Sequence, residues 1–258
     1  MLLIDSHCHL DDPRFDPDRA RVLARARKAG VVAMVVPGIV RDDWPRLRAT
    51  CHADPGLHPA YGLHPMFLDR HQGDDLEELE RWLLREPAVA VGECGLDFHI
   101  QDPRPDEQRA LFEAQVALAV RLDLPLIVHA RKALDAVLQI LRRHPGCRGV
   151  LHSFSGSPEQ ARQALGLGFL FGFGGAVTHD RATRLHRLVT ALPPTALLLE
   201  TDAPYQPDAG IRGQRNEPAR LAAILEAVAA LRGEPAGTIA RATTENACDL
   251  FGLTPPAR

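Results

Sequence analysis

Two histidines near the start of the chain have the spacing of a metal-binding pair. His7 and His9 follow the apolar run Leu2–Ile4, which has the composition of a short strand. Residues two apart in an extended segment point to the same side, so both imidazoles can face one metal ion. Such a pair is a weak signal alone, because two solvated loop histidines would have the same spacing.

Four more ionisable residues stand at or just after the ends of similar apolar runs: Glu93 after Ala88–Val91, His129 after Leu124–Val128, His152 after Gly149–Leu151 and Asp202 after Ala196–Leu199. Clustered and buried, these groups would be unfavourable unless cations neutralised the carboxylates. Four imidazoles and two carboxylates can hold two divalent ions if one carboxylate bridges, and its central position suits Glu93 for that bridge. Mg²⁺ or Mn²⁺ suits the carboxylates, and the imidazoles would also accept Zn²⁺.

The elements that must position these residues can be read from the apolar runs. Continuous runs of this kind predict strands buried on both faces, as in a parallel sheet covered by helices. Eight such runs are present: Leu2–Ile4, Val31–Ile39, Ala60–Leu63, Ala88–Val91, Leu124–Val128, Gly149–Leu151, Phe169–Phe173 and Ala196–Leu199.

Segments with helical spacing lie between these runs and after the last one. They are Asp18–Ala29, Asp106–Leu122, Lys132–His144, Pro158–Leu167, Asp180–Leu192, Pro218–Leu231 and Glu234–Phe251. Eight strand–helix units in 258 residues predict an α/β fold, a (β/α)8 TIM barrel forming a single domain over residues 1–258. An open doubly wound sheet is the alternative, although it usually has fewer strands. In a barrel the active site lies at the carboxyl ends of the strands, where the ionisable residues stand.

Charge and cysteine content narrow the function classes. The 30 Lys plus Arg and 33 Asp plus Glu leave a net charge of −3, which argues against a protein that coats duplex DNA through a basic surface. A nuclease that grips a few phosphates in a cleft is still allowed. Five scattered cysteines without a CxxC pair suit reduced thiols. With neither a signal-peptide pattern nor an 18-residue apolar run, we expect a cytoplasmic protein without membrane attachment, and we infer no obligate protein partner.

Candidate substrate-binding residues lie beside the proposed ligands. His64 follows the run Ala60–Leu63 and is a candidate phosphate contact. Arg131 comes two residues after His129, where it can contact a phosphodiester. Arg215 and Asn216 lie in a polar loop after the eighth run. That loop either holds the end of a nucleic acid or orders itself through internal hydrogen bonds, and the sequence favours neither.

Taken together, the motifs DSHCHL, GECGLDF, LIVHAR, LHSFSG, LLLETDAPY and RGQRNEP resemble those of the TatD family of metal-dependent deoxyribonucleases. The resemblance runs from Asp5 to the last helix. It implies that His7, His9, Glu93 and Asp202 hold one divalent ion, and that Glu93, His129 and His152 hold the second. Asp202, beside the attacking water, would then act as the general base or orient that water.

The resemblance implies a metal-dependent hydrolase of DNA, a 3′–5′ exodeoxyribonuclease acting on single strands or ends. One alternative is a hydrolase of small-molecule amides, lactones or phosphotriesters, many of which bridge their metals with a modified lysine on strand 4. Here Glu93 has that position, and neither Lys28 nor Lys132 lies on that strand. Hydrolysis of D-aminoacyl-tRNA is a related alternative. A non-catalytic metal-binding or partner-binding barrel is disfavoured, because no ligand is missing.

Overall fold

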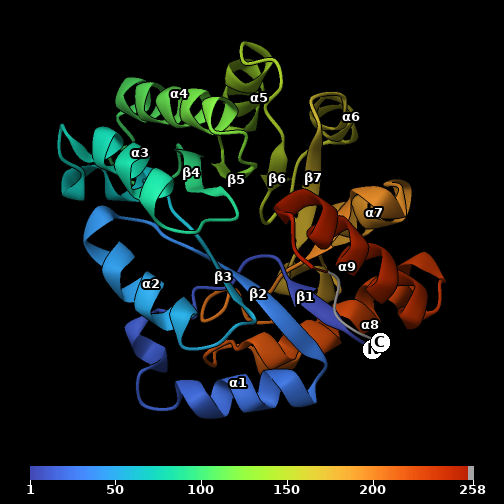
Figure 1. Ribbon diagram of the computed structural model, residues 1–258. Helices are drawn as coiled ribbons and strands as arrows, with labels where there is room; N and C mark the ends of the chain where they lie inside the picture. The colour runs from blue at the N-terminus through green and yellow to red at the C-terminus, as the bar shows by residue number, and fades with distance from the viewer. Residues whose placement is uncertain (255–258) are drawn as a thin grey trace. The chain divides into compact units, whose positions relative to one another are not determined.

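Strands and helices alternate along the chain in the computed structural model, which describes residues 1–254 (Figure 1). The strands are β1 (Leu3–Asp5), β2 (Val31–Pro37), β3 (Leu57–Ala60), β4 (Val91–Asp97), β5 (Leu126–Arg131), β6 (Gly149–Leu151), β7 (Phe169–Phe173) and β8 (Leu197–Leu199). The α-helices are α1 (Arg19–Lys28), α2 (Trp44–His52), α3 (Asp75–Arg85), α4 (Pro105–Arg121), α5 (Leu134–Arg142), α6 (Pro158–Gly166), α7 (Thr183–Ala191), α8 (Leu221–Arg232) and α9 (Ala236–Phe251). This order, with every paired strand parallel to its neighbour, is that of the predicted (β/α)8 barrel.

The described chain forms two compact units, each assembled from segments that are separate in sequence. The first unit comprises residues 1–36, 50–58 and the chain from residue 171 onward. In it β1 pairs with β2, β7 pairs with β8, and the backbone N–H of Ser6 donates to Leu199 O at 3.0 Å. The segment after β1 is therefore hydrogen-bonded to β8.

The second unit comprises residues 37–49 and 59–170. Its strands β4, β5 and β6 are consecutive parallel neighbours, and α4 and α5 lie beside them (Figure 1). Every residue of β4 is buried, as expected of a parallel strand covered on both faces. Among residues 1–254, no helix is long and apolar enough to cross a membrane. The prediction of one domain over residues 1–258 stays a prediction.

Two strand positions predicted from the sequence are wrong. β3 ends at Ala60, where the predicted strand Ala60–Leu63 begins, and β4 begins at Val91, where the predicted strand Ala88–Val91 ends. β4 continues through polar residues because it pairs with β5 over Cys94–Asp97, and Gly95 permits a close approach. At φ 136° this glycine lies so near β5 that a Cβ there would stand 2.0 Å from His129 O.

Two candidate ligands lie inside strands and not, as predicted, after them. Glu93 lies inside β4 and His129 inside β5, whereas the apolar runs predicted both to follow their strands. Helices α2 and α3 were not among the predicted helices. In α3, Leu79 and Leu83 are one turn apart and buried, which is the pattern of an amphipathic helix.

Candidate metal centre

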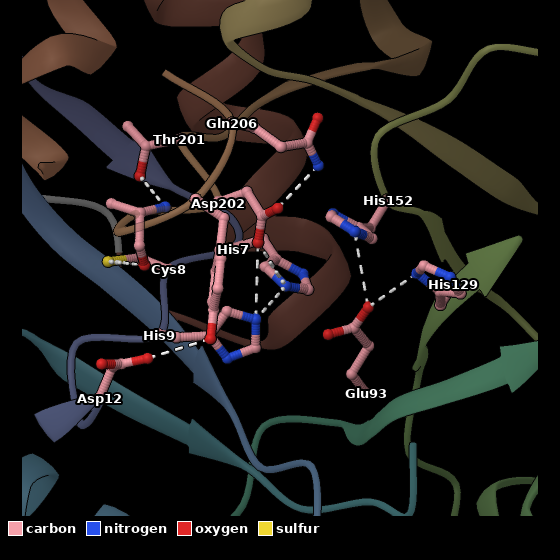
Figure 2. A network of polar contacts seen from close by, with 12 residues as sticks. His7, Cys8, His9, Asp12, Glu93, His129, His152, Thr201, Asp202 and Gln206 are labelled. Carbon is pink, nitrogen blue, oxygen red and sulfur yellow. Dashed lines mark hydrogen bonds and ion pairs between the residues drawn. The ribbon is translucent and has the colours of Figure 1, made fainter. Parts of the chain in front are cut away.

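The first donor group consists of His7, His9 and Asp202, all in the first unit (Figure 2). The Nε2 atoms of the two imidazoles lie 3.1 Å apart, and each lies 3.5 Å from Asp202 Oδ1. The three side chains are 0 to 11% exposed. Two imidazole nitrogens and a carboxylate oxygen thus converge on one small volume.

Backbone hydrogen bonds between the turns after β1 and β8 hold this group together. Asp202 N donates to His7 O at 2.9 Å, and His9 N donates to Ala203 O at 2.8 Å. Asp5, at the end of β1, accepts from Thr201 N at 2.9 Å and from its hydroxyl at 2.6 Å. Burial raises the pKa of Asp5 to about 7, although the hydrogen bonds from Thr201 and His7 lower it. Asp5 thereby fixes the spacing between the two turns.

The two oxygens of Asp202 have different partners. Oδ1 faces the imidazoles, whereas Oδ2 accepts a 2.7 Å hydrogen bond from the side-chain amide of Gln206 (Figure 2). The backbone is left-handed at both residues, with φ values of 56° and 44°. This turn aims the Gln206 amide at the carboxylate and leaves Oδ1 as the oxygen available to a cation.

The second donor group consists of Glu93 with His64, His129 and His152, all in the second unit. Glu93 Oε1 lies 3.2 Å from His64 Nε2, 3.3 Å from His129 Nδ1 and 3.5 Å from His152 Nε2. Figure 2 shows the rings of His129 and His152 turned toward this oxygen. The Glu93 side chain is only 4% exposed, so three imidazoles surround one buried carboxylate oxygen.

Asp97 orients His129 from the opposite side of the ring. His129 Nε2 lies 2.9 Å from Asp97 Oδ2, which leaves Nδ1 facing Glu93. Burial lowers the pKa of His129, but hydrogen bonds with Asp97 and Glu93 outweigh it and raise the pKa overall. Burial likewise raises the pKa of Asp97, but the hydrogen bonds from His129 and the His99 backbone, with the nearby positive charges, together outweigh it and lower that pKa. A carboxylate behind a ligating imidazole is the common arrangement at metal sites.

The position of Asp97 is itself fixed by α4. Its backbone N–H donates to Gln108 Oε1 at 2.7 Å, and Gln108 Nε2 returns a 2.9 Å bond to Asp97 O. Gln108 is fully buried. The helix therefore sets the rotation of β4 at the point where its carboxylates are presented.

Both groups fit divalent cations. Ligands about 2.0–2.2 Å from a tetrahedral metal ion lie about 3.3 Å or slightly more from one another. The 3.1 to 3.5 Å separations within the first donor group match that spacing. In the second, His64, Glu93 and His129 present ligand atoms that all lie within 4.8 Å of one another. Buried nitrogen and oxygen donors of this kind suit Mn²⁺, Mg²⁺ or Zn²⁺.

Comparison with known proteins identifies the family. The family model described as TatD related DNase matches residues 4–252. The chain belongs to this family. The uncharacterized metal-dependent hydrolase YjjV of Escherichia coli K12 is 42% identical over 253 residues, which cover 97% of this chain and 98% of YjjV. The 3′-5′ ssDNA/RNA exonuclease TatD of Klebsiella pneumoniae strain 342 is 37% identical, with 97% of this chain and 98% of that protein covered.

Comparison with solved structures gives the same family and fold. The crystal structure of YjjV matches with a TM-score of 0.94 and 41% identity, over 98% of each chain. A TatD family hydrolase from Entamoeba histolytica matches with a TM-score of 0.86 at 22% identity, over 97% of this chain and 98% of its own, and supports the fold alone. The predicted family and the (β/α)8 barrel are confirmed, and this TatD-family protein is a metal-dependent hydrolase.

The predicted substrate residues of this TatD-family chain have different surroundings. His64 precedes the 3₁₀ segment Pro65–Arg70, and its Nδ1 accepts from Met66 N at 3.1 Å, which turns Nε2 toward Glu93. His64 thus lies in a donor group, and its predicted phosphate contact stays a prediction. Arg131 ends β5 with an exposed side chain, and its predicted phosphodiester contact also stays a prediction.

Arg215 and Asn216 favour the alternative that their loop orders itself. Arg215 binds both carboxylate oxygens of Asp18 at 2.8 Å and donates to Arg14 O at 2.7 Å. Asn216 is fully buried, and its amide donates to the carbonyls of Thr201 and, at 2.7 Å, Tyr205. Both residues therefore hold the loop that follows Asp202, and their predicted substrate contacts stay predictions.

Sequence reasoning missed the partners of the ligands, namely Asp97, Gln108 and Gln206. Asp97 lies within the GECGLDF motif, so its acidic type four residues after Glu93 was an available signal. Gln108 gave a weaker one, as a polar residue on the buried face of an amphipathic helix. The sequence carried no signal for Gln206, because the direction of its side chain depends on a left-handed turn that contains no glycine.

Proposed function

We propose that this TatD-family hydrolase cleaves phosphodiester bonds of DNA, removing nucleotides from the 3′ side of single strands or ends. The observation that supports it best is the pair of buried donor groups, each with a carboxylate oxygen among imidazole nitrogens. In the proposal His7, His9, Glu93 and Asp202 hold one divalent ion, and Glu93, His129 and His152 hold the second. It rests on the barrel fold, in which the carboxyl ends of the strands carry the active site.

Two divalent ions, when bound, polarise a phosphoryl oxygen, lower the pKa of water and stabilise the leaving alkoxide. The chain supplies the proton acceptor. Asp202 takes the proton from the attacking water or orients that water. The Gln206 amide, bonded to Oδ2, holds the carboxylate in one orientation. Asp97 keeps Nδ1 of His129 directed at Glu93. Arg131, exposed at the end of β5, contacts the phosphodiester.

The proposed DNA substrate has support from the relatives and is consistent with the charge. The Klebsiella pneumoniae relative, 37% identical, is named as an exonuclease of single-stranded DNA and RNA. Because the net charge is −3, the protein must attract phosphates through bound cations and a few local arginines. We therefore expect DNA affinity to fall only gently with salt, with a slope corresponding to few phosphate contacts.

We also propose Mg²⁺ or Mn²⁺ as the physiological ions and the cytoplasm as the location. Carboxylate oxygens favour the first two ions, although the imidazoles also accept Zn²⁺. All five cysteines are free and buried, as expected in a reducing compartment.

A chelation and add-back assay tests the proposal. The protein is stripped with EDTA and given Mg²⁺, Mn²⁺ or Zn²⁺ singly, with a single-stranded oligonucleotide labelled at its 5′ or 3′ end. Exonuclease action from the 3′ side predicts a ladder of shortening products from the 5′-labelled strand, and early release of a labelled mononucleotide from the 3′-labelled strand. Asp202→Asn, purified identically, controls for contaminating nucleases. Absence of metal-dependent shortening with all three ions would overturn the proposed function.

A further inference from the structure

An aromatic ring lies exposed beside the first donor group. Tyr205 is 44% exposed, whereas most large apolar side chains of the described chain are buried. It follows Asp202 by three residues, and its backbone N–H donates to Asp202 O at 2.8 Å. The centroid of its ring lies 5.8 Å from that of His9 in an edge-to-face arrangement. The ring is therefore a direct neighbour of a candidate metal ligand.

The ring of Tyr205 is fixed in place. Its hydroxyl donates to Asp12 Oδ2 at 3.1 Å, and the Arg14 guanidinium lies 4.1 Å from the ring centroid. With His9 against another part of the ring, the side chain is held on three sides while nearly half of it faces solvent. A ring held in this way loses little rotamer freedom when a second ring stacks on it.

Arg14 supports the ring and is neutralised by its own neighbour. Its Nε donates to Asp12 Oδ1 at 3.0 Å and its Nη2 to Oδ2 at 2.9 Å, a bidentate pair. Arg215 in turn donates to Arg14 O at 2.7 Å, which anchors the segment from the other side. With Asp12 and Arg14 cancelling in charge, the surface attracts flat, uncharged rings better than phosphate groups.

We propose that Tyr205, backed by Arg14, is a stacking subsite for a nucleobase of the strand being cut. The subsite rests on the proposed function, since it takes the base of a nucleotide whose phosphodiester lies at the metal ligands. Stacking on an aromatic ring tolerates every base, because each has a π-face. The subsite therefore adds affinity for a strand end without adding sequence preference. Arg215 is a positioning residue for the subsite, acting through the backbone of Arg14.

The experiment tests whether the Tyr205 side chain stacks on a base or only supports the turn that contains Asp202. Steady-state constants are measured for the wild type, Tyr205→Ala and Tyr205→Phe on single-stranded oligonucleotides. In one set all bases are present, and in another a single base is replaced by an abasic residue at each of the last three positions from the 3′ end. Leu84→Ala, which removes another exposed side chain, is the matched control. Dissociation constants are measured by fluorescence anisotropy in the inactive Asp202→Asn background, with and without Tyr205→Ala.

Stacking predicts that Tyr205→Ala raises KM and the dissociation constant about 5- to 100-fold on the complete strand. One abasic position should cause a similar loss in the wild type, and the two losses should not add at that position. Tyr205→Phe, which keeps the ring and loses only its hydroxyl bond to Asp12, should lose much less than Tyr205→Ala, and Leu84→Ala should stay within about twofold of the wild type. An equal loss on complete and abasic strands, or a fall in kcat with KM unchanged, would overturn the subsite. Wild-type protein that cuts no oligonucleotide would instead overturn the proposed function.

Discussion

The two donor groups are built from different kinds of backbone. In the first, all three ligands lie on turns that follow β1 and β8, and backbone hydrogen bonds between those turns set their spacing. In the second, Glu93 and His129 lie inside β4 and β5, with Glu93 where the register of their pairing shifts. The other two members, His64 and His152, follow β3 and β6. Turns open locally more readily than paired, buried strands. We therefore expect the second group to keep its geometry without a cation better than the first.

The groups also differ in what supports their ligands. In the first, the second oxygen of Asp202 accepts a hydrogen bond from Gln206. In the second, Glu93 lies among three imidazoles, and the carboxylate of Asp97 stands behind His129. Glu93 is the proposed bridge and counts for both ions, so the ranking rests on Asp97, which orients His129 and makes it a stronger ligand, and on the ligands held inside strands. We therefore expect the second group to bind a divalent ion more tightly, and the substitutions below test that ranking.

Glu93→Gln is expected to have the largest effect. It removes the charge that three imidazoles face and a carboxylate ligand that the proposal shares between both ions. Mn²⁺ binding, measured by titration calorimetry, should weaken by more than the roughly 10- to 100-fold that follows the loss of a partner behind a ligand. Because Glu93 is the proposed bridge, both binding events should weaken. Glu107→Gln, on the exposed face of α4, is the matched control. Retention of two binding events at wild-type affinity would exclude the bridge.

Asp202→Asn is expected to reduce turnover by about 10²- to 10⁴-fold, the usual effect of losing a general base. Its effect on Mn²⁺ binding should be confined to the first donor group, so that one binding event disappears and the tighter one remains. The melting temperature should change little, because backbone bonds hold this turn. Calorimetry and kcat on a single-stranded oligonucleotide check both points. Loss of the tighter binding event instead would reverse the proposed ranking of the two groups.

Asp97→Asn and Gln206→Ala compare the supports behind the two groups. Substituting a carboxylate behind a ligating imidazole lowers metal affinity about 10- to 100-fold, so Asp97→Asn should weaken the tighter event by that amount. Gln206→Ala removes one amide donor from an oxygen not facing the imidazoles, and we expect less than about tenfold change at the weaker event. The readout is the two Mn²⁺ dissociation constants. A larger effect from Gln206→Ala than from Asp97→Asn would contradict the comparison.

These contrasts mark how far the sequence could predict the site. The ligand types and their order were visible, because His7, His152 and Asp202 follow apolar strands, as barrel geometry requires. The strand position of Glu93 was not visible, since β4 is interrupted by polar residues and glycines and breaks the apolar pattern. Which nitrogen of His129 faces Glu93 was equally hidden, because it depends on where β4 and α4 place Asp97.

The roles of the loop after β8 were the least predictable. Arg215 and Asn216 are residue types that bind phosphate as readily as they order a loop. Arg215 and Asn216 bond within the protein because Asp18 and the carbonyls of the turn lie within their reach, and only the structure shows this. Such partners are distant in sequence, and left-handed residues such as Asp202 determine where they meet.

The smallest expected effect concerns the surface pair that holds this loop. The hydrogen bonds of Arg215 lower the pKa of Asp18 to about 2 from its ordinary 3.8. A lowered pKa contributes stability that is present above about pH 4 and is lost as the pH falls toward 2. Because the pair is solvent-exposed and screened, Asp18→Asn should lower the melting temperature at pH 7 by less than about 2 °C.

Hydrogen exchange in the same variant locates that effect. At pH 5, where Asp18 is ionised, Asp18→Asn should speed exchange at residues 203–217, which Arg215 anchors, and leave β4 and β5 unchanged. Added salt should shrink the difference between variant and wild type. Faster exchange spread evenly over both donor groups would show that the turns and the strands open as one unit, and the contrast between them would then be lost.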